Sequence, residues 1–205
     1  MKFSIALIFI LSVGFSSCLP TRSLRHFTLY GETKKVDPKK FKINGIYFSV
    51  IPRACNRFWY SDLIKCFIFY ENGFFFSIDH SGLDTLDMEA SLNQYLEILD
   101  KLGFKGGFKG DVRYWGSYFI DDNKLLTQKY DTDAFRWVLG PILRAKIINN
   151  TTIEFDEGFC FNNEEVSKRF TLVETKSKPD SVNIFMTNKR IKRKLDRLYK
   201  ERHTR

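Results

Sequence analysis

KCFIFYENGFFFSI, residues 65–78, holds the turn sequence Glu71-Asn72-Gly73 between two runs of apolar and aromatic residues. Asn-Gly pairs readily adopt the positive φ angles that a tight hairpin turn requires. The flanking runs are rich in residues that favour strands, and they are largely apolar on both faces. We therefore predict a β-hairpin formed by Lys65–Tyr70 and Phe74–Ile78, which lies deep in a sheet.

Further strands are predicted on both sides of this hairpin. Lys42–Val50 is rich in β-forming residues, and later strand-like segments are separated by turn sequences such as Asp121-Asp122-Asn123-Lys124. These later segments are Asp111–Ile120, Leu125–Tyr130, Phe135–Val138, Ala145–Ile148, Thr152–Phe155, Phe170–Glu174 and Val182–Thr187. Many short strands at nearly even spacing predict a mainly β domain, built as an antiparallel barrel or sandwich.

One amphipathic helix is predicted to interrupt the strands. Apolar residues recur there with the period of a helix, at Met88, Leu92, Tyr95, Leu96, Leu99 and Leu102. Asp84 or Thr85 can cap the start and Gly103 can end it, which sets the helix at about residues 85–102. We expect its apolar face to cover an open mouth or an edge of the sheet.

The formal net charge of +9 comes mostly from residues 188–205, where nine Lys or Arg stand against two acids. The rest of the chain is close to neutral, so we predict no nucleic-acid partner, which would need a basic patch across one face. Apolar residues in this stretch have helical spacing, at Ile191, Leu195, Leu198 and Tyr199. The pattern predicts either a basic amphipathic helix, which binds an anionic membrane or a protein partner, or a frayed and solvated terminus.

The N-terminus has the features of an export signal. Lys2 precedes the apolar run Ile5–Val13, which is too short to span a bilayer. Phe15-Ser16-Ser17-Cys18 resembles the lipobox of Gram-negative bacterial lipoproteins. The resemblance implies that residues 1–17 are removed and that a lipid on Cys18 anchors the chain, as an outer-membrane lipoprotein facing the periplasm. The alternative is an ordinary signal peptide cut near Ser17, which would give a secreted protein.

Two short patterns resemble lipocalin-like lipoproteins. Gly45-Ile46-Tyr47 is similar to the start of the first barrel strand in that family, and the sequence WGSYFI at residues 115–120 is similar to one of its strands. The resemblance implies a lipocalin-like barrel. We accordingly expect a tether over residues 18–40, one β domain over residues 41–187 and a basic extension over residues 188–205.

Two groups of residues could form a catalytic, metal or anion site. Asp79 and His80, with Asp84, combine a histidine with carboxylates, but their loop position favours a solvated turn over a metal or acid-base site. The repeat GFKGGFKG at residues 103–110 can form an anion-binding nest, although flexibility alone explains a glycine-rich connector. The sequence has no nucleophile, metal or phosphate-loop motif, so we predict no enzymatic activity, no metal and no cofactor.

Cysteines and hydroxyls offer sites of covalent modification. Once Cys18 carries lipid, three cysteines remain, and the short loop favours a disulfide between Cys55 and Cys66. Other pairings that include Cys160, or three buried thiols, stay open. Asp84-Thr85-Leu86 and Asp180-Ser181-Val182 resemble acceptor sites of a bacterial O-glycosylation system for exported proteins, which makes Thr85 and Ser181 candidate sites.

The aromatic content, 21 Phe, 9 Tyr and 3 Trp, suits either of two interiors. A filled barrel would leave the protein a structural or interaction role, whereas a hollow one could carry a small apolar ligand or a lipid. We therefore expect a membrane-anchored periplasmic lipoprotein with a non-enzymatic binding or structural role. The alternative is a carrier of a small apolar ligand or lipid in a barrel cavity.

Overall fold

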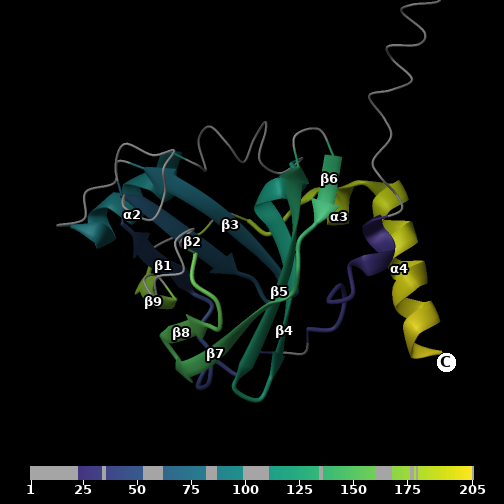
Figure 1. Cartoon of the computed structure of the whole chain (residues 1–205), viewed down its shortest axis with the longest axis horizontal. Helices are drawn as coiled ribbons and strands as arrows, with labels where there is room; N and C mark the ends of the chain where they lie inside the picture. Colours follow the sequence, from purple (N-terminus) through teal and green to yellow (C-terminus); the bar gives the residue numbers. More distant parts are fainter. Residues whose placement is uncertain are drawn as a thin grey trace, which may run out of the picture.

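The computed structural model describes residues 23–33, 36–52, 62–81, 87–98, 111–133, 136–159, 168–175, 178 and 180–204 (Figure 1). The strands within these ranges are β1 (Gly45–Ile51), β2 (Leu63–Phe69), β3 (Phe74–Ser81), β4 (Trp115–Asp121), β5 (Lys124–Asp133), β6 (Arg136–Leu139), β7 (Leu143–Asn149), β8 (Thr152–Phe155) and β9 (Arg169–Glu174). The helical elements are η1 (Ser23–His26), α2 (Met88–Ile98), η5 (Val112–Tyr114), α3 (Ile184–Thr187) and α4 (Lys189–His203).

Eight of the described strands close into an antiparallel barrel. Their order is β4-β3-β2-β1-β9-β8-β7-β5, and β5 pairs back onto β4 to complete the ring. Strand β6 pairs only with the last part of β5, at residues 130–133. Strands that follow each other in sequence are neighbours in the ring, as in an up-and-down barrel. The predicted antiparallel, lipocalin-like barrel is confirmed.

The hairpin predicted within residues 65–78 forms as expected, from β2 and β3. Its register pairs Cys66 with Ile78 and Phe69 with Phe75. Gly73 in the turn has a φ angle of 82°, and its N–H donates to the Tyr70 carbonyl at 3.1 Å. A side chain at position 73 would be strained by this φ angle and would meet Thr33.

Both faces of this hairpin are buried because the barrel has a core on each side of β2 and β3. Inward residues such as Phe67, Phe69 and Phe75 belong to an inner core within the barrel. Outward residues such as Ile68 and Phe76 belong to an outer core, which the helical elements cover. Every residue of β2 is accordingly buried.

Helix α2 lies against the outer core through Leu92, Tyr95 and Leu96. Its tyrosine contacts His80 of β3 edge-on, with ring centroids 4.3 Å apart. The predicted amphipathic helix is confirmed, but it packs on the outer core of the sheet. The Asp87 carboxylate accepts from the N–H of Ala90 at 3.1 Å near the start of the helix. The predicted caps, Asp84 and Thr85, lie outside the described residues.

Two expectations are wrong. The strand predicted at Val182–Thr187 is instead the short helix α3, because Asn183 caps it by accepting from the N–H of Phe185 at 2.9 Å. The Phe185 ring then stacks on Phe74 in the outer core, 5.8 Å between centroids. The tether expected over residues 18–40 is also wrong in its described part, since Leu24 and Phe27 are buried in the same core.

Residues 188–204 form part of the domain. The Asn188 side chain caps α4 by accepting from the N–H groups of Arg190 and Ile191, each at 3.1 Å. Ile191 and Leu195 are buried in the outer core. The predicted basic amphipathic helix is confirmed, and the basic extension is corrected to a docked helix, because its apolar face completes the core.

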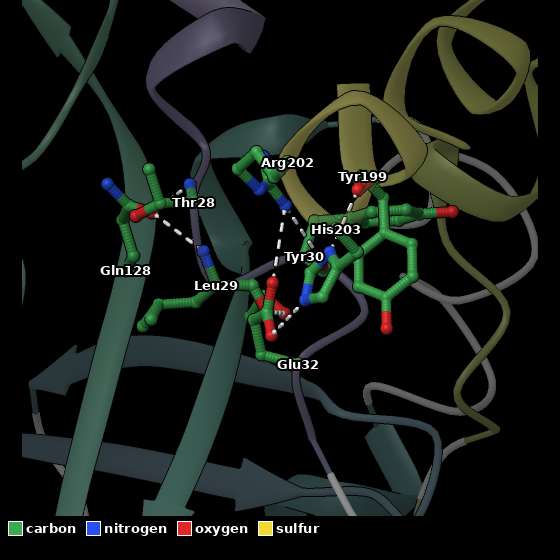
Figure 2. Close-up of polar contacts among 9 residues, drawn as sticks. Thr28, Leu29, Tyr30, Glu32, Gln128, Tyr199, Arg202 and His203 are labelled. Atoms are coloured by element: carbon green, nitrogen blue, oxygen red, sulfur yellow. Dashed lines mark hydrogen bonds and ion pairs between the residues drawn. The ribbon is translucent and has the colours of Figure 1, made fainter. Parts of the chain in front are cut away.

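The N-terminal segment is held between the barrel and α4 (Figure 2). The buried Gln128 side chain on β5 accepts from the N–H of Thr28 and donates to the His26 carbonyl, each at 2.9 Å. On the other side, the Tyr30 hydroxyl donates to Asp196 of α4 at 2.7 Å.

Among the described residues, no helix has both the length and the apolar character needed to span a membrane.

A second set of contacts ties the end of α4 to the same segment (Figure 2). The Arg202 guanidinium donates to the Tyr30 carbonyl at 3.2 Å and lies 3.6 Å from the Glu32 carboxylate. His203 lies 3.3 Å from the other oxygen of that carboxylate. The first and last described parts of the chain therefore pack as one unit.

Candidate functional site: a cup at one end of the barrel

One end of the barrel interior, called here the closed end, is filled by aromatic side chains. Phe41 stacks on Tyr47 with ring centroids 5.1 Å apart and meets Phe69 edge-on at 5.2 Å. The Tyr118 hydroxyl donates to the Tyr70 carbonyl at 2.7 Å. These rings are almost completely buried and their hydroxyls have partners, so this end offers no room for a ligand.

The opposite end contains a cavity of about 340 Å³, called here the cup. It is lined by Lys65, Phe67, Phe75, Asp79, Thr127, Lys129, Gly140, Pro141, Leu143 and Phe159. Cavities that bind small molecules usually have volumes of about 300–1,000 Å³, apolar walls and a few polar groups. The cup lies at the small end of that range and combines aromatic walls with charged and hydroxyl side chains.

An ion pair spans two strands in the cup. Register pairs Lys65 of β2 with Asp79 of β3, and the Lys65 amine lies 2.7 Å from the Asp79 carboxylate. The lysine side chain is only 10% exposed, whereas that of the aspartate is 39% exposed. The same amine lies 5.0 Å from the centroid of the Phe159 ring, within the range of a cation–π contact. The amine is therefore fixed between an anion and an aromatic face.

Two buried hydroxyls face the same interior. Ser77 and Thr127 are each 1% exposed, and within the described residues neither hydroxyl has a hydrogen-bond partner. Thr127 lines the cup, and Ser77 is paired in register with Phe67, which also lines it. A buried hydroxyl without a partner costs about 1–3 kcal/mol. A water or a ligand group in the cup would remove that cost.

The structure separates the histidine and carboxylate that sequence analysis grouped. Asp79 points into the barrel, whereas His80, the next residue on the strand, faces α2 on the outside. Asp84 and the repeat at residues 103–110 lie outside the described residues. Among the described residues, no group of three or more His, Cys, Asp or Glu could hold a metal ion.

The predicted modification sites are only partly described. Cys66 is a buried free thiol on β2, and burial raises its pKa to about 12. Its expected partner Cys55 lies outside the described residues, as do Cys18, Thr85 and Cys160, so the bridge, the lipid and the Thr85 sugar stay predictions. Ser181 is half-buried, and its hydroxyl accepts from the Asn72 amide at 2.8 Å. Its glycosylation also stays a prediction.

Sequence analysis missed the residues of the cup. The available signal was the presence of Lys65 and Ser77 at inward positions of a hairpin that is otherwise apolar. Thr127 and Phe159 could not have been grouped with them, because their proximity depends on the closure of the ring. No model of a known protein family, curated protein sequence or solved structure matches the chain.

Proposed function

We propose that this protein is an exported, membrane-tethered and non-enzymatic binding protein whose cup holds a small amphipathic molecule. The observation that carries the proposal is the cup itself, where the unpartnered Thr127 hydroxyl and a fixed ion pair share a cavity with three phenylalanine rings. Such a lining suits a ligand with a flat or short apolar part and a polar group that forms hydrogen bonds.

The closed end limits the size of that ligand. A long acyl chain would have to enter the region that Phe41, Tyr47 and Phe69 fill. Close-packed rings of this kind do not move aside without a large cost. We therefore propose a ligand shorter than a long-chain fatty acid, which narrows the lipid carrier considered from the sequence.

The proposed site can be tested by fluorescence titration of the full chain with anilinonaphthalene sulfonate, followed by displacement with octanoate and with palmitate. We expect one saturable site, displaced by octanoate at least as well as by palmitate. Thr127→Val keeps the shape of the side chain and removes its hydroxyl, so affinity should fall about fivefold, as expected for one lost hydrogen bond. Absence of saturable binding to the folded protein would exclude the proposal.

The matched control is Thr171→Val on β9, which makes the same chemical change on an exposed, outward-facing position. It should leave the affinity unchanged. An equal loss in both variants would show that the probe binds elsewhere on the barrel.

The tether is supported by the N-terminal sequence, where the cysteine of the proposed lipid anchor lies five residues before Ser23, the first residue of η1. Mass spectrometry of the protein purified from membranes should find Cys18 as the first residue and the added mass of acyl chains. Detection of the intact N-terminal methionine and no acyl mass would contradict this part of the proposal.

A further inference from the structure

Helix α4 has a cationic outer face opposite the face that docks on the domain. Ile191 and Leu195 face the core. The cations Lys189, Arg193, Arg197 and Lys200 follow one another at spacings of four, four and three residues. Residues at such spacings lie on one side of a helix. All four are exposed, so their side chains present positive charge to the solvent.

The acids of α4 neutralise little of this face. Asp196 pairs with Lys192 at 2.7 Å and accepts from Tyr30, and Glu201 lies 3.8 Å from Arg197. Within the part of the chain that the structure describes, Lys189, Arg193 and Lys200 form no ion pair. Three of the exposed cations therefore form no ion pair, although Lys200 lies close enough to Asp196 to help lower the pKa of that carboxyl.

Cations also gather where η1 meets α4. Partial burial lowers the pKa of Lys194, and the charges of Arg25, Arg197 and Arg190 lower it further. The arginine of η1 therefore lies close enough to α4 to add to its positive field. Leu24 of η1 shares the outer core with Ile191 and Leu195, which places η1 against the helix (Figure 1).

We propose that the outer face of α4, together with Arg25 of η1, binds the surface of an anionic lipid membrane. The position of Cys18, the proposed site of the lipid, favours a membrane over other anionic partners. Ser23 lies five positions after Cys18, and five extended residues span at most about 18 Å. A lipid at Cys18 would thus hold η1 and α4 next to the bilayer. The orientation rests on the proposed tether, whereas the charged face exists without it.

The mode of binding differs from the one that the sequence suggested. An interfacial amphipathic helix inserts its apolar face between lipids, but that face of α4 is already buried in the outer core. The remaining attraction is electrostatic. It contributes about 1 kcal/mol for each Lys or Arg near an anionic surface, and salt screens it over about 10 Å.

The test compares binding of the full chain to phosphatidylcholine vesicles and to vesicles in which part of this lipid is replaced by phosphatidylglycerol. Binding to neutral vesicles measures the contribution of the proposed lipid on Cys18. The increase in binding on anionic vesicles measures the contribution of α4. The variant Lys189→Gln/Arg193→Gln/Lys200→Gln removes three charges while retaining good helix formers. We expect it to lower the partition onto anionic vesicles about 100-fold, and we expect added salt to weaken wild-type binding.

The matched control is Lys39→Gln/Lys124→Gln/Lys146→Gln, which removes the same charge from exposed positions away from α4. It should reduce anionic binding only a few-fold. Equal loss in the two folded variants, salt-independent binding, or capture by an acidic protein in place of vesicles would each overturn the inference. If Cys18→Ser abolishes binding to neutral vesicles and the anionic increase remains, the tether is supported and the inference stands. If binding to neutral vesicles does not depend on Cys18, the proposed tether is contradicted, and the inference about α4 still stands.

Discussion

The two ends of the barrel interior share strand β2 and differ in how their side chains fill the space. At the closed end, Phe69 and Tyr118 are completely buried and the tyrosine hydroxyl has a partner. At the cup, Lys65 and Thr127 bring a charge and an unpaired hydroxyl into the same interior. We therefore expect the closed end to contribute most to the stability of the barrel, whereas the proposed binding site lies in the cup.

The largest expected effect comes from removing one ring at each end. Phe69→Ala should lower the free energy of unfolding by about 3–5 kcal/mol, because the site is fully packed and cannot collapse around the cavity. Phe159→Ala at the partly exposed rim of the cup should cost clearly less. Urea denaturation of both variants measures the difference. Similar losses would show that the cup is as important for stability as the closed end.

A sharper comparison uses two hydroxyl-bearing residues that are paired in register on neighbouring strands. Tyr118 of β4 is paired in register with Thr127 of β5, but only the tyrosine hydroxyl has a partner. Tyr118→Phe should cost about 0.5–1.5 kcal/mol, since it removes one hydrogen bond to the Tyr70 carbonyl, which keeps the one from the Gly73 N–H. Thr127→Val should be neutral or stabilising in the absence of ligand.

Thermal and urea unfolding of these two variants provide the measurement. A destabilising effect of Thr127→Val in ligand-free protein would mean that its hydroxyl already has a bound water, and the argument for a ligand group there would fail. Tyr118→Phe without any cost would remove the distinction between the two ends.

The smallest expected effect concerns the ion pair between Lys192 and Asp196 outside the barrel, where both side chains are exposed, in contrast to the pair in the cup, where the lysine is buried. Burial would raise the pKa of Asp196, but hydrogen bonds from Lys192 and Tyr30 outweigh it and leave that pKa below its ordinary value. The ionised carboxylate thus stabilises the fold above the ordinary carboxyl pKa, and this contribution is lost as pH falls through the folded-state pKa. Because the pair is exposed, Asp196→Asn should cost less than about 1 kcal/mol at neutral pH.

Unfolding free energies of the wild type and of Asp196→Asn, measured from neutral to acidic pH, test this expectation. The difference between the two proteins should shrink toward zero in acid. A difference that is constant with pH would show that the asparagine acts through packing, and the charge of Asp196 would then have no part in docking α4.

Sequence analysis predicted an antiparallel barrel or sandwich because the signals for its strands and turns are local. The Asn-Gly turn and the aromatic runs of residues 65–78 specify a hairpin without reference to the rest of the chain. The strand predicted at Val182–Thr187 is wrong because a short apolar run does not distinguish a strand from a helix. The Asn183 cap and the burial of Phe185 in the outer core stabilise a helix there. The local sequence pattern also could not show that Leu24, Phe27 and Leu29 are buried.

The cup lay beyond sequence analysis for a related reason. The pairing of Lys65 with Asp79 follows from hairpin register, which the turn nearly determines. The meeting of these residues with Thr127 and Phe159 requires the ring to close between strands far apart in the chain. Such long-range proximity is a property of the fold, and no spacing in one sequence records it.

The contact between the N-terminal segment and α4 also affects how the protein is made. Because α4 is the last of the described helices to be synthesised, a nascent chain lacks the α4 side chains that share a core with Leu24 until residues 189–203 have left the ribosome. A chain that stops before Lys189 would lack Ile191 and Leu195, so its outer core would be incomplete around Leu24. Proteolysis should therefore remove prematurely terminated products while it spares the finished protein.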